Sequence, residues 1–276
     1  MLSAGFCASR SIDAILATPE AVAAYLAAEA EAGRKPSTIG RRCAAIRHAH
    51  RLAGYDPPTA SEIVKATTRG IRRTHGVAPR KLAAATSEKT IGMAAMVRQD
   101  LIGKRDRAIL LVGFSMAARR SELVALDMDD ITFCDEGMRI RVKRSKTDQE
   151  GQGCTVAVPF GQRACPVEAL RSYLAMAGIT RGPIFRSIRR GGHVQDRRLG
   201  AKHVLLVVKQ HAAKLGLDAS TFGAHSLRSG FITSAAARGA SIFKMQAVSR
   251  HKSVDVLSGY VRDADAFNNH AGAGLL

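Results

Sequence analysis

The chain is 276 residues long and 46% of its residues are hydrophobic, so it can form one large domain or two modest ones with buried cores, which excludes an intrinsically disordered chain. Lysine and arginine number 42 against 23 aspartate and glutamate, and the formal net charge of +19 favours a polyanionic partner such as nucleic acid. Only 5% of the residues are aromatic and tryptophan is absent, which argues against an RNA-binding protein that stacks bases on aromatic rings.

Cysteine usage and hydropathy favour a protein of the reducing cytoplasm that does not span a membrane. The five cysteines are odd in number and show neither a C-x-x-C pair nor zinc-ligand spacing. The longest nearly apolar run, residues 108–118, is too short to span a bilayer, and the chain does not open with the basic segment of a signal peptide. No metal site or glycine-rich phosphate loop is indicated, so we expect no cofactor.

The first 17 residues read as the end of a helix and a connection, so we expect the N-terminal domain to be shortened at its start. Thr18 is a suitable N-cap, and Pro19 suits the first helical position. The alanine-rich segment that follows predicts a helix that stops at Gly33.

Two arginine-rich helices follow. One begins after Pro36, and the other opens with a capping box at Thr59–Glu62. No acidic residue lies between Glu31 and Asp56 to pair with the arginines of the first helix. A solvated surface is one interpretation of these charges, and contact with DNA phosphates is the other. The candidate DNA contacts are Arg41, Arg42, Arg47, Arg51, Arg69, Arg72 and Arg73.

Glycine, proline and small residues between 74 and 86 indicate an interdomain linker. We place the boundary near residue 82, which gives a helical domain over 1–82 and a second domain over 83–276. Apolar spacing in the second domain predicts helices, with a core formed by Leu110, Leu111, Phe114 and Met116. These helices are expected over residues 87–98, 104–118, 166–177 and 199–215.

Alternation of apolar and polar residues predicts two strands, 137–144 and 154–159, joined as a hairpin with Lys146 near its tip. We expect Asp129 and Asp130 to cap the turn that precedes the hairpin rather than to bind magnesium. The basic segment 184–198 is expected to be a loop.

The stretch from 223 to 262 carries the densest pattern of reactive residue types. His225 and Arg228 stand three apart at the start of an alanine-rich helical segment, so both side chains project from one face. A second short helix leads to His251, and a third carries Tyr260.

This order resembles the C-terminal signature of the tyrosine recombinase (phage integrase) family: H-x-x-R, then an H-K segment, then a tyrosine nine positions after that histidine. Residues 117–131, AARRSELVALDMDDI, resemble the first arginine motif of the family. Residues 144–153, RSKTDQEGQG, resemble the loop that carries its lysine. The three segments occur in the family's order and span most of residues 100–265.

The resemblance implies a mainly α (α+β) fold, with a helical N-terminal domain that clamps DNA and a mostly helical catalytic domain with a small antiparallel sheet. It implies site-specific recombination of the integration or excision type, as in mobile elements. Tyr260 would attack a scissile phosphate and form a 3′-phosphotyrosyl link, and the released 5′ hydroxyl would later attack a partner strand. The link conserves the bond energy, so no ATP is implied. The expected assembly is a homotetramer on two sites in double-stranded DNA.

Attack on a phosphodiester builds negative charge, which two arginine forks can stabilise. Arg228 is one candidate. Arg119 and Arg120 are neighbours that project about 100° apart on a helix, so spacing leaves both open. The family motif selects Arg119, and Glu122 is then the carboxylate that orients it, with an ordinary surface ion pair as the alternative.

A tyrosine nucleophile, with an ordinary pKa of about 10, needs a base or a cationic site to stabilise the phenolate. His225 and His251 can supply a base and a hydrogen bond to the phosphate. Lys146 occupies the position of the family's lysine, and as general acid it would protonate the leaving 5′ oxygen. Lys143 is a competitor for that role.

Two other functions stay open. A topoisomerase IB-like enzyme that nicks and religates DNA would use the same groups. A DNA-binding protein with a decayed active site is the other alternative, although every position that matches the family carries a chemically competent residue.

Overall fold

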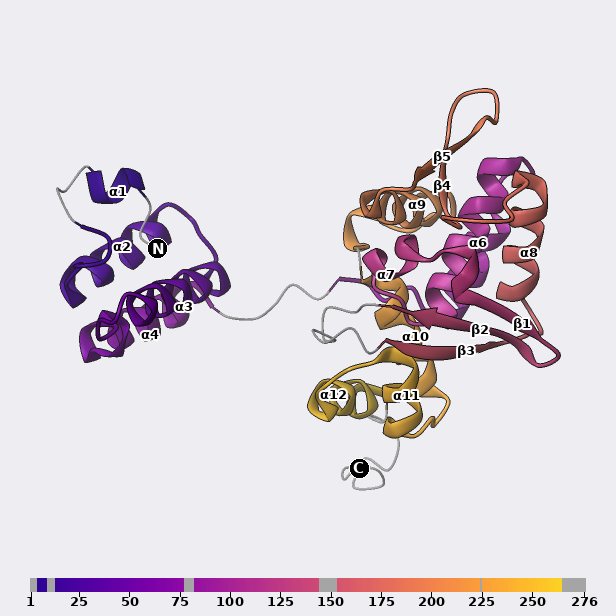
Figure 1. Cartoon of the computed structure of the whole chain (residues 1–276). Coiled ribbons are helices and arrows are strands. Elements are labelled where there is room, and N and C mark those ends of the chain that lie inside the picture. Colours follow the sequence, from indigo (N-terminus) through magenta and orange to yellow (C-terminus); the bar gives the residue numbers. More distant parts are fainter. Residues whose placement is uncertain (1–3, 9–12, 77–81, 144–152, 224, 265–276) are drawn as a thin grey trace, which may run out of the picture. The chain divides into compact units, whose positions relative to one another are not determined.

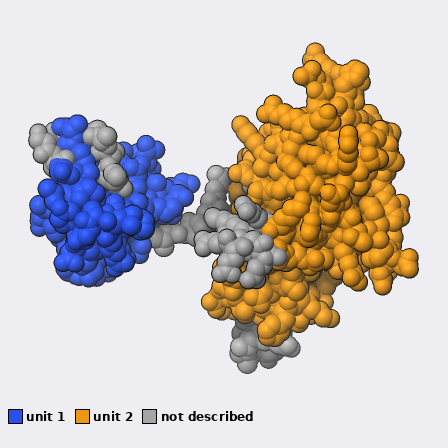
Figure 2. Space-filling view, in the orientation of Figure 1, with its two compact units in different colours: residues 1–81 blue, residues 82–276 orange. Residues whose placement is uncertain are grey.

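A computed structural model describes residues 4–8, 13–76, 82–143, 153–223 and 225–264 (Figure 1). Its contacts divide the chain into two compact units, residues 1–81 and 82–276, coloured separately in Figure 2. Each unit has a hydrophobic core of its own. Over the described residues, none of the helices has the length and apolarity needed to cross a membrane.

All of the regular secondary structure described in unit 1 is helical. Thr18 caps the second helix as predicted, because its hydroxyl accepts a hydrogen bond from the Ala21 N–H at 3.3 Å. The elements are α1 (Ala4–Ala8), α2 (Pro19–Glu31), α3 (Pro36–Leu52), a 3₁₀ turn (Pro58–Ala60) and α4 (Glu62–His75).

The core of unit 1 forms where one face of each long helix meets the others. Each long helix contributes a residue that is only 1% exposed: Tyr25 of α2, Ile46 of α3 and Val64 of α4. The short helix α1 joins this core, since Cys7 is buried and the ring of Phe6 meets that of Tyr25 edge to face at 5.1 Å. The polar faces of α3 and α4 therefore point outward with their arginines.

The predicted capping box at Thr59–Glu62 is wrong. Thr59 is buried in the 3₁₀ turn, and its hydroxyl accepts a hydrogen bond from Arg47 Nε at 3.4 Å. The proline at the start of that turn fixes the local backbone, and α4 begins only at Glu62 after an extended Ser61. Thr59 thus joins two elements instead of capping one.

Unit 2 is mostly helical, with a small antiparallel sheet, as the sequence predicts. Its helices are α5 (Ser87–Ala95), α6 (Leu101–Ser115), α7 (Arg120–Ala125), α8 (Pro166–Ala177), α9 (Ala201–Lys214), α10 (Ser226–Ala237), α11 (Ile242–Ser249) and α12 (Val254–Ala264), with 3₁₀ turns at Met128–Asp130 and Ala219–Thr221. Its strands are β1 (Ile131–Cys134), β2 (Gly137–Val142), β3 (Cys154–Pro159), β4 (Arg186–Ile188) and β5 (Val194–Arg198).

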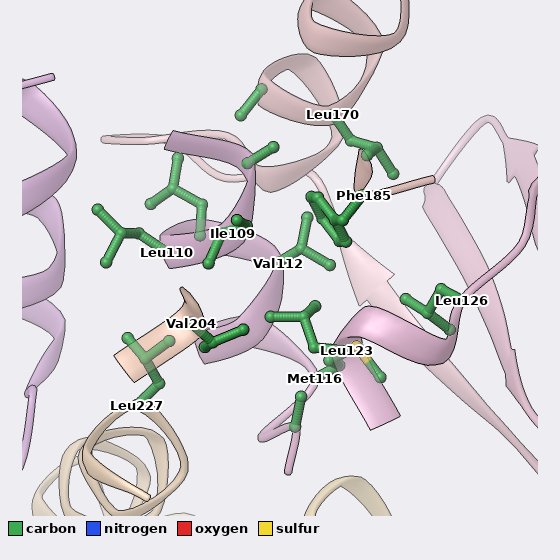
Figure 3. Close-up of a cluster of buried hydrophobic side chains, with 14 of the residues drawn as sticks. Ile109, Leu110, Val112, Met116, Leu123, Leu126, Leu170, Phe185, Val204 and Leu227 are labelled. Carbon is green, nitrogen blue, oxygen red and sulfur yellow. The ribbon is translucent and has the colours of Figure 1, made fainter. Parts of the chain in front are cut away.

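Helix α6 is the centre of unit 2, since all its residues from Ala108 to Gly113 are buried. A helix enclosed on all sides needs apolar residues around its whole circumference, which explains its weak amphipathic pattern. The predicted core residues Leu110, Leu111 and Met116 are buried, and Phe114 packs at the edge. Figure 3 shows the side chains that surround α6, among them Leu123, Leu126, Leu170, Phe185, Val204 and Leu227.

The three-stranded sheet has the order β1, β2, β3, with each pair antiparallel. In β2 the apolar residues Met138, Ile140 and Val142 are buried and the intervening arginines are exposed, which is the alternation that predicted the strand. The predicted hairpin of β2 and β3 is confirmed, and β1 adds a strand at its edge. Lys146 lies outside the described residues.

Residues 184–198 were expected to be a loop and instead contain a second hairpin, β4 with β5. Its turn carries Gly191 and Gly192 with φ of 85° and 83°, a left-handed backbone that glycine adopts without strain. The strands are rich in arginine and lack apolar alternation, so their pattern did not indicate a sheet. In Figure 1 the hairpin projects from the body of unit 2.

Helix α10 is held against the segment that enters unit 2. The Ala85 N–H donates to the Ser226 carbonyl at 2.9 Å, and a Cβ added at Gly230 would lie 1.8 Å from the Ala85 carbonyl oxygen. Only glycine allows so close an approach. This contact fixes the position of α10 and hence of Arg228, which it carries.

Candidate active site

Arg228 lies on α10 and is 5% exposed. Its Nη1 donates a hydrogen bond to the carbonyl oxygen of Ala117 at 2.7 Å. Ala117 follows Met116, the C-cap of α6, and has a φ of 45°, a left-handed conformation that is strained for alanine. The strained turn therefore aims a carbonyl at the guanidinium and fixes its orientation.

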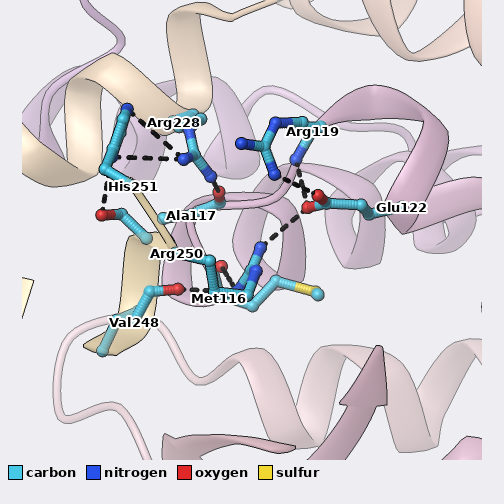
Figure 4. A network of polar contacts seen from close by, with 9 residues as sticks. Met116, Ala117, Arg119, Glu122, Arg228, Val248, Arg250 and His251 are labelled. Carbon is cyan, nitrogen blue, oxygen red and sulfur yellow. Dashed lines mark hydrogen bonds and ion pairs between the residues drawn. The ribbon is translucent and has the colours of Figure 1, made fainter. Parts of the chain in front are cut away.

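Arg119 is the N-cap of α7, and Glu122 holds it from two sides (Figure 4). The Arg119 N–H donates to Glu122 Oε2 at 2.9 Å, and its Nη1 donates to Oε1 at 2.5 Å. The side chain of Glu122 is 2% exposed and that of Arg119 is 14% exposed. Arg120 is exposed. Of the adjacent pair, Arg119 is thus the one that lies beside Arg228 and His251, as Figure 4 shows.

His251 lies against Arg228, whose Nη2 is 3.2 Å from Nδ1 and 3.3 Å from Nε2 of the ring. The Ser249 hydroxyl is 2.8 Å from Nδ1. Burial, together with the charges of Arg228, Arg119 and Arg250, lowers the pKa of His251 to about 4. The imidazole is therefore neutral at neutral pH and can accept a proton or a hydrogen bond.

Arg250 is a member of this cluster that the sequence did not reveal. Its Nη2 donates to Glu122 Oε2 at 2.8 Å, and its Nη1 donates to the carbonyl oxygens of Val248 at 2.6 Å and Met116 at 3.1 Å. The side chain is 8% exposed. No motif pointed to Arg250, because a basic residue beside a histidine in a positively charged chain reads as surface charge.

The cluster carries more positive than negative charge, since Arg119, Arg228 and Arg250 surround the carboxylate of Glu122. Burial, with the charges of Arg119 and Arg250, lowers the pKa of Arg228 to about 10, so it is still protonated at neutral pH. Burial acts to raise the pKa of Glu122, but the Arg119 N–H and the charge of Arg250 hold it below its ordinary value. Such a site is suited to an anion.

Tyr260 lies on α12, half-buried against Ile232, Met245 and Leu257. It is close enough to Arg228 for a phenolate there to favour the protonated guanidinium. His225 is the N-cap of α10, one helical turn before Arg228, and is exposed. The structure therefore places both residues on elements that carry or adjoin the arginine cluster.

Lys143 is paired with carboxylates at the base of the hairpin. Its Nζ lies 3.1 Å from Asp130 Oδ2 and 3.1 Å from Asp127 Oδ2. Hydrogen bonds to Asp130 and Asp127 raise the pKa of Lys143, which makes it a poorer proton donor. Asp130 also caps the turn as expected, because it accepts a hydrogen bond from the Asp127 N–H at 3.0 Å.

The predicted DNA contacts of unit 1 lie on α3 and α4, and all are exposed except Arg42, which is half-buried. Arg42 Nε lies 3.0 Å from Glu29 Oε2, and its guanidinium also contacts the Tyr25 hydroxyl. The sequence did not indicate this partner, because Glu29 lies on α2 whereas Arg42 lies on α3. Arg69 pairs with Glu62, which lies about two turns earlier on the same face of α4. In the described part of the chain, no group of three or more histidine, cysteine or carboxylate side chains is placed to hold a metal ion.

A model of the phage integrase family matches residues 86–266, which is more than half of the chain and includes every member of the arginine cluster. The chain belongs to the phage integrase family. Over 272 residues it is 35% identical to an integrase/recombinase XerD homolog of Selenomonas ruminantium, a match that covers 96% of this chain and 80% of the relative.

The fold agrees with this family. The structure of a lambda integrase dimer bound to a COC′ core site has a TM-score of 0.61 and 20% identity, over 90% of this chain and 65% of that one. The Tn1549 transposon integrase in complex with a circular intermediate DNA has a TM-score of 0.65 and 13% identity, over 90% of this chain and 82% of that one. At such identities the likeness establishes the fold.

Family membership makes the chain a DNA-binding enzyme. It is a tyrosine recombinase, which cleaves and rejoins DNA strands in site-specific recombination through a phosphotyrosine intermediate. The predicted family, fold class and reaction are confirmed.

Proposed function

We propose that Tyr260 is the nucleophile of this recombinase and that Arg119, Arg228 and His251 bind and activate the scissile phosphate. The observation that carries the proposal is the cluster around Glu122: arginine donors in excess over carboxylates, with a neutral histidine among them. A phosphodiester supplies the missing negative charge. Its oxygens gain further charge during attack, so fixed donors stabilise the transition state more than the ground state.

The side chains divide the chemical tasks among them. A guanidinium has five N–H donors, so Arg228 and Arg119 can bind phosphate oxygens while they keep their contacts to Ala117 and Glu122. His251 and His225 share the tasks of accepting the phenol proton and donating a hydrogen bond to the phosphate. Lys146 protonates the 5′ oxygen as it leaves, since Lys143 is held by two carboxylates.

Residues 1–82 clamp double-stranded DNA through the exposed arginines of α3 and α4, and residues 83–276 form the catalytic domain. The proposed assembly is a homotetramer on two DNA sites in the cytoplasm, and the reaction is integration or excision of a mobile element. A transposon integrase is among the proteins that share this fold, which agrees with such a role. The cleaved strand is kept as a 3′-phosphotyrosyl link, so strand transfer needs no cofactor.

A nicked duplex tests the nucleophile. With a nick just beyond the scissile phosphate, the released 5′ fragment diffuses away and the covalent adduct accumulates. We expect Tyr260→Phe to abolish the denaturant-resistant adduct while the dissociation constant for DNA changes little, because affinity is spread over many phosphate contacts. Tyr55→Phe, which changes a half-exposed tyrosine of unit 1, is the matched control and should retain the adduct.

An adduct that persists in Tyr260→Phe contradicts the assignment. A second arm with two intact candidate sites separates recombination from nicking and religation. Recombinant products support strand exchange, whereas relaxation of supercoils without such products supports the topoisomerase alternative.

A further inference from the structure

We propose that Arg250 is a positioning residue that sets the orientation of Arg119 through Glu122. The inference rests on the proposed function, because Arg119 matters only if it binds the scissile phosphate. Arg250 itself donates its hydrogen bonds to Glu122 and backbone carbonyls, so it would affect catalysis indirectly (Figure 4).

Glu122 is shared between Arg119 and Arg250. Its Oε2 accepts from the Arg119 N–H at 2.9 Å and from Arg250 Nη2 at 2.8 Å, while its Oε1 accepts from Arg119 Nη1 at 2.5 Å. Arg250 thus holds the carboxylate from the side opposite Arg119. Without that contact, Arg119 is the one remaining partner of the carboxylate among the described residues, and both side chains gain freedom to rotate together.

The ion pair between Glu122 and Arg250 is buried. The side chains of Glu122 and Arg250 are 2% and 8% exposed, so solvent screens their interaction little. Arg250 also donates to the carbonyl oxygen of Met116, at the end of α6, and to that of Val248 on α11. A buried arginine with acceptors on three segments is held in one orientation. Its contact with Glu122 therefore restricts the orientation of that carboxylate as well.

The backbone at Arg250 has an unusual conformation. Among the described residues other than glycine, positive φ is found at Ala117 and at Arg250, where it is 58°. Glycine would adopt this conformation without strain, and a side chain there is unfavourable unless its contacts compensate. The contacts that compensate at Arg250 are those to Glu122 and the two carbonyls. Both strained residues hold an arginine of the proposed site in place.

Arg250 joins two segments that are far apart in the chain. Arg250 directly precedes His251, and the chain then continues into α12 with Tyr260. Arg119 and Glu122 lie on α7, more than 120 residues earlier, as the separation of 128 between Glu122 and Arg250 shows. The Arg250 contact therefore ties the segment that carries the nucleophile to the segment that carries the phosphate ligand.

Arg250→Gly is the decisive variant, because it removes the side chain and also relieves the strained φ. We expect the melting temperature to fall, because a buried ion pair loses one partner, while the dissociation constant for DNA stays near that of the wild type. The single-turnover rate of adduct formation at saturating DNA should fall about 100-fold, the scale on which a small misplacement of a reacting group acts. Arg250→Lys keeps one charged donor and should recover part of the rate. Arg238→Ala, which removes an exposed cation at the end of α10, should leave the rate unchanged.

A double-mutant cycle with Glu122 tests the route of the effect. If Arg250 acts through Glu122, adding Arg250→Gly to Glu122→Ala should slow adduct formation no further, and it should raise the melting temperature by removing an unpaired buried cation. Glu122→Gln serves the same cycle if the alanine variant does not fold. Losses of rate that multiply, or a wild-type rate in Arg250→Gly, overturn the inference.

The same assay separates this inference from the function it rests on. An adduct that forms in the wild type and is lost in Tyr260→Phe supports the proposed nucleophile whatever Arg250 does. If Arg250→Gly lowers the melting temperature and DNA affinity but not the rate at saturating DNA, its role is structural and the positioning inference fails alone.

Discussion

Acidification should destabilise unit 2 through His251. In the folded protein burial and the charges of Arg228, Arg119 and Arg250 lower the pKa of this imidazole to about 4, against an ordinary value of 6.5. As pH falls below 6.5, the unfolded chain takes up the proton first, so the unfolded state gains stability relative to the folded one. The contribution of His251 is therefore complete above about pH 7 and is lost as pH falls toward 4.

The magnitude follows from the two pKa values. Between about pH 7 and pH 5 the free energy of unfolding would fall by about 2 kcal/mol for a fully shielded ring. The ring is only partly buried, so solvent screening reduces this to roughly 1 kcal/mol. For a unit of this size such a loss lowers the melting temperature by about 2–4 °C.

Thermal unfolding of the full chain at both pH values, with wild type and His251→Gln compared, measures the effect. The wild type should lose more stability on acidification than the variant does. His203→Gln, a change at an exposed histidine of α9, should behave like the wild type. The reasoning is refuted if His251→Gln loses as much stability as the wild type, or if the His251 ring titrates by NMR at pH 6.5 or above.

Three further changes test the site and its support. Arg119→Ala should slow adduct formation about 100-fold or more, the scale of losing a transition-state donor, while Arg120→Ala should do much less, and the reverse order of single-turnover rates would exchange their roles. Lys146→Ala should be rescued by a substrate with sulfur in place of the 5′ bridging oxygen, because a thiolate leaves without a proton; equal defects on both substrates would move the acid role elsewhere, with Lys143 tested next. Gly230→Ala should lower the melting temperature strongly, because a Cβ there would lie 1.8 Å from a backbone oxygen, and an unchanged melting temperature would contradict that packing.

The sequence predicted the elements whose local pattern matches their environment. Thr18 caps α2 because N-capping depends on neighbouring residues alone. The β2–β3 hairpin was predicted because one face of β2 is buried and the other is exposed, so its pattern has a period of two. The motif around Arg228 was found because the order of residue types along the chain matched a family.

The failures share a different cause, since each depends on a partner that lies on another element of the fold. Thr59 was expected to cap a helix, but it is buried against Arg47. The strands β4 and β5 carry charged residues whose pairing is set by the backbone and by contacts such as Arg186 Nη1 to Asp196 Oδ1 at 2.9 Å. Glu29 as a partner of Arg42 was missed for the same reason.

The site shows the same limit more sharply. The motifs identified Arg119, Arg228 and the carboxylate of Glu122 as candidates, but nothing in the motifs indicated that Arg228 and Glu122 are held by groups distant in the chain. Ala117 at a φ of 45° aims a carbonyl at Arg228, and Arg250 at 58° reaches Glu122. A strained backbone is a property of the whole fold and leaves no local signal when the residue is not glycine.

The arginine cluster combines strained backbone with like charges, both of which destabilise the folded state. The packing of the surrounding helices must offset this cost. Arg119 and Arg250 each lower the pKa of Arg228, so the cluster carries repulsion in the absence of an anion. Helix α6 ends in this cluster and is buried on all sides, while α10 is pressed against the chain at Gly230. If the cluster binds the scissile phosphate as we propose, these packed helices hold the donors in place before the phosphate arrives, so the enzyme does not have to reorganise them during strand cleavage. On the same proposal, a phosphodiester that enters the cluster relieves the repulsion, and the charge that destabilises the free site then contributes to binding of the transition state.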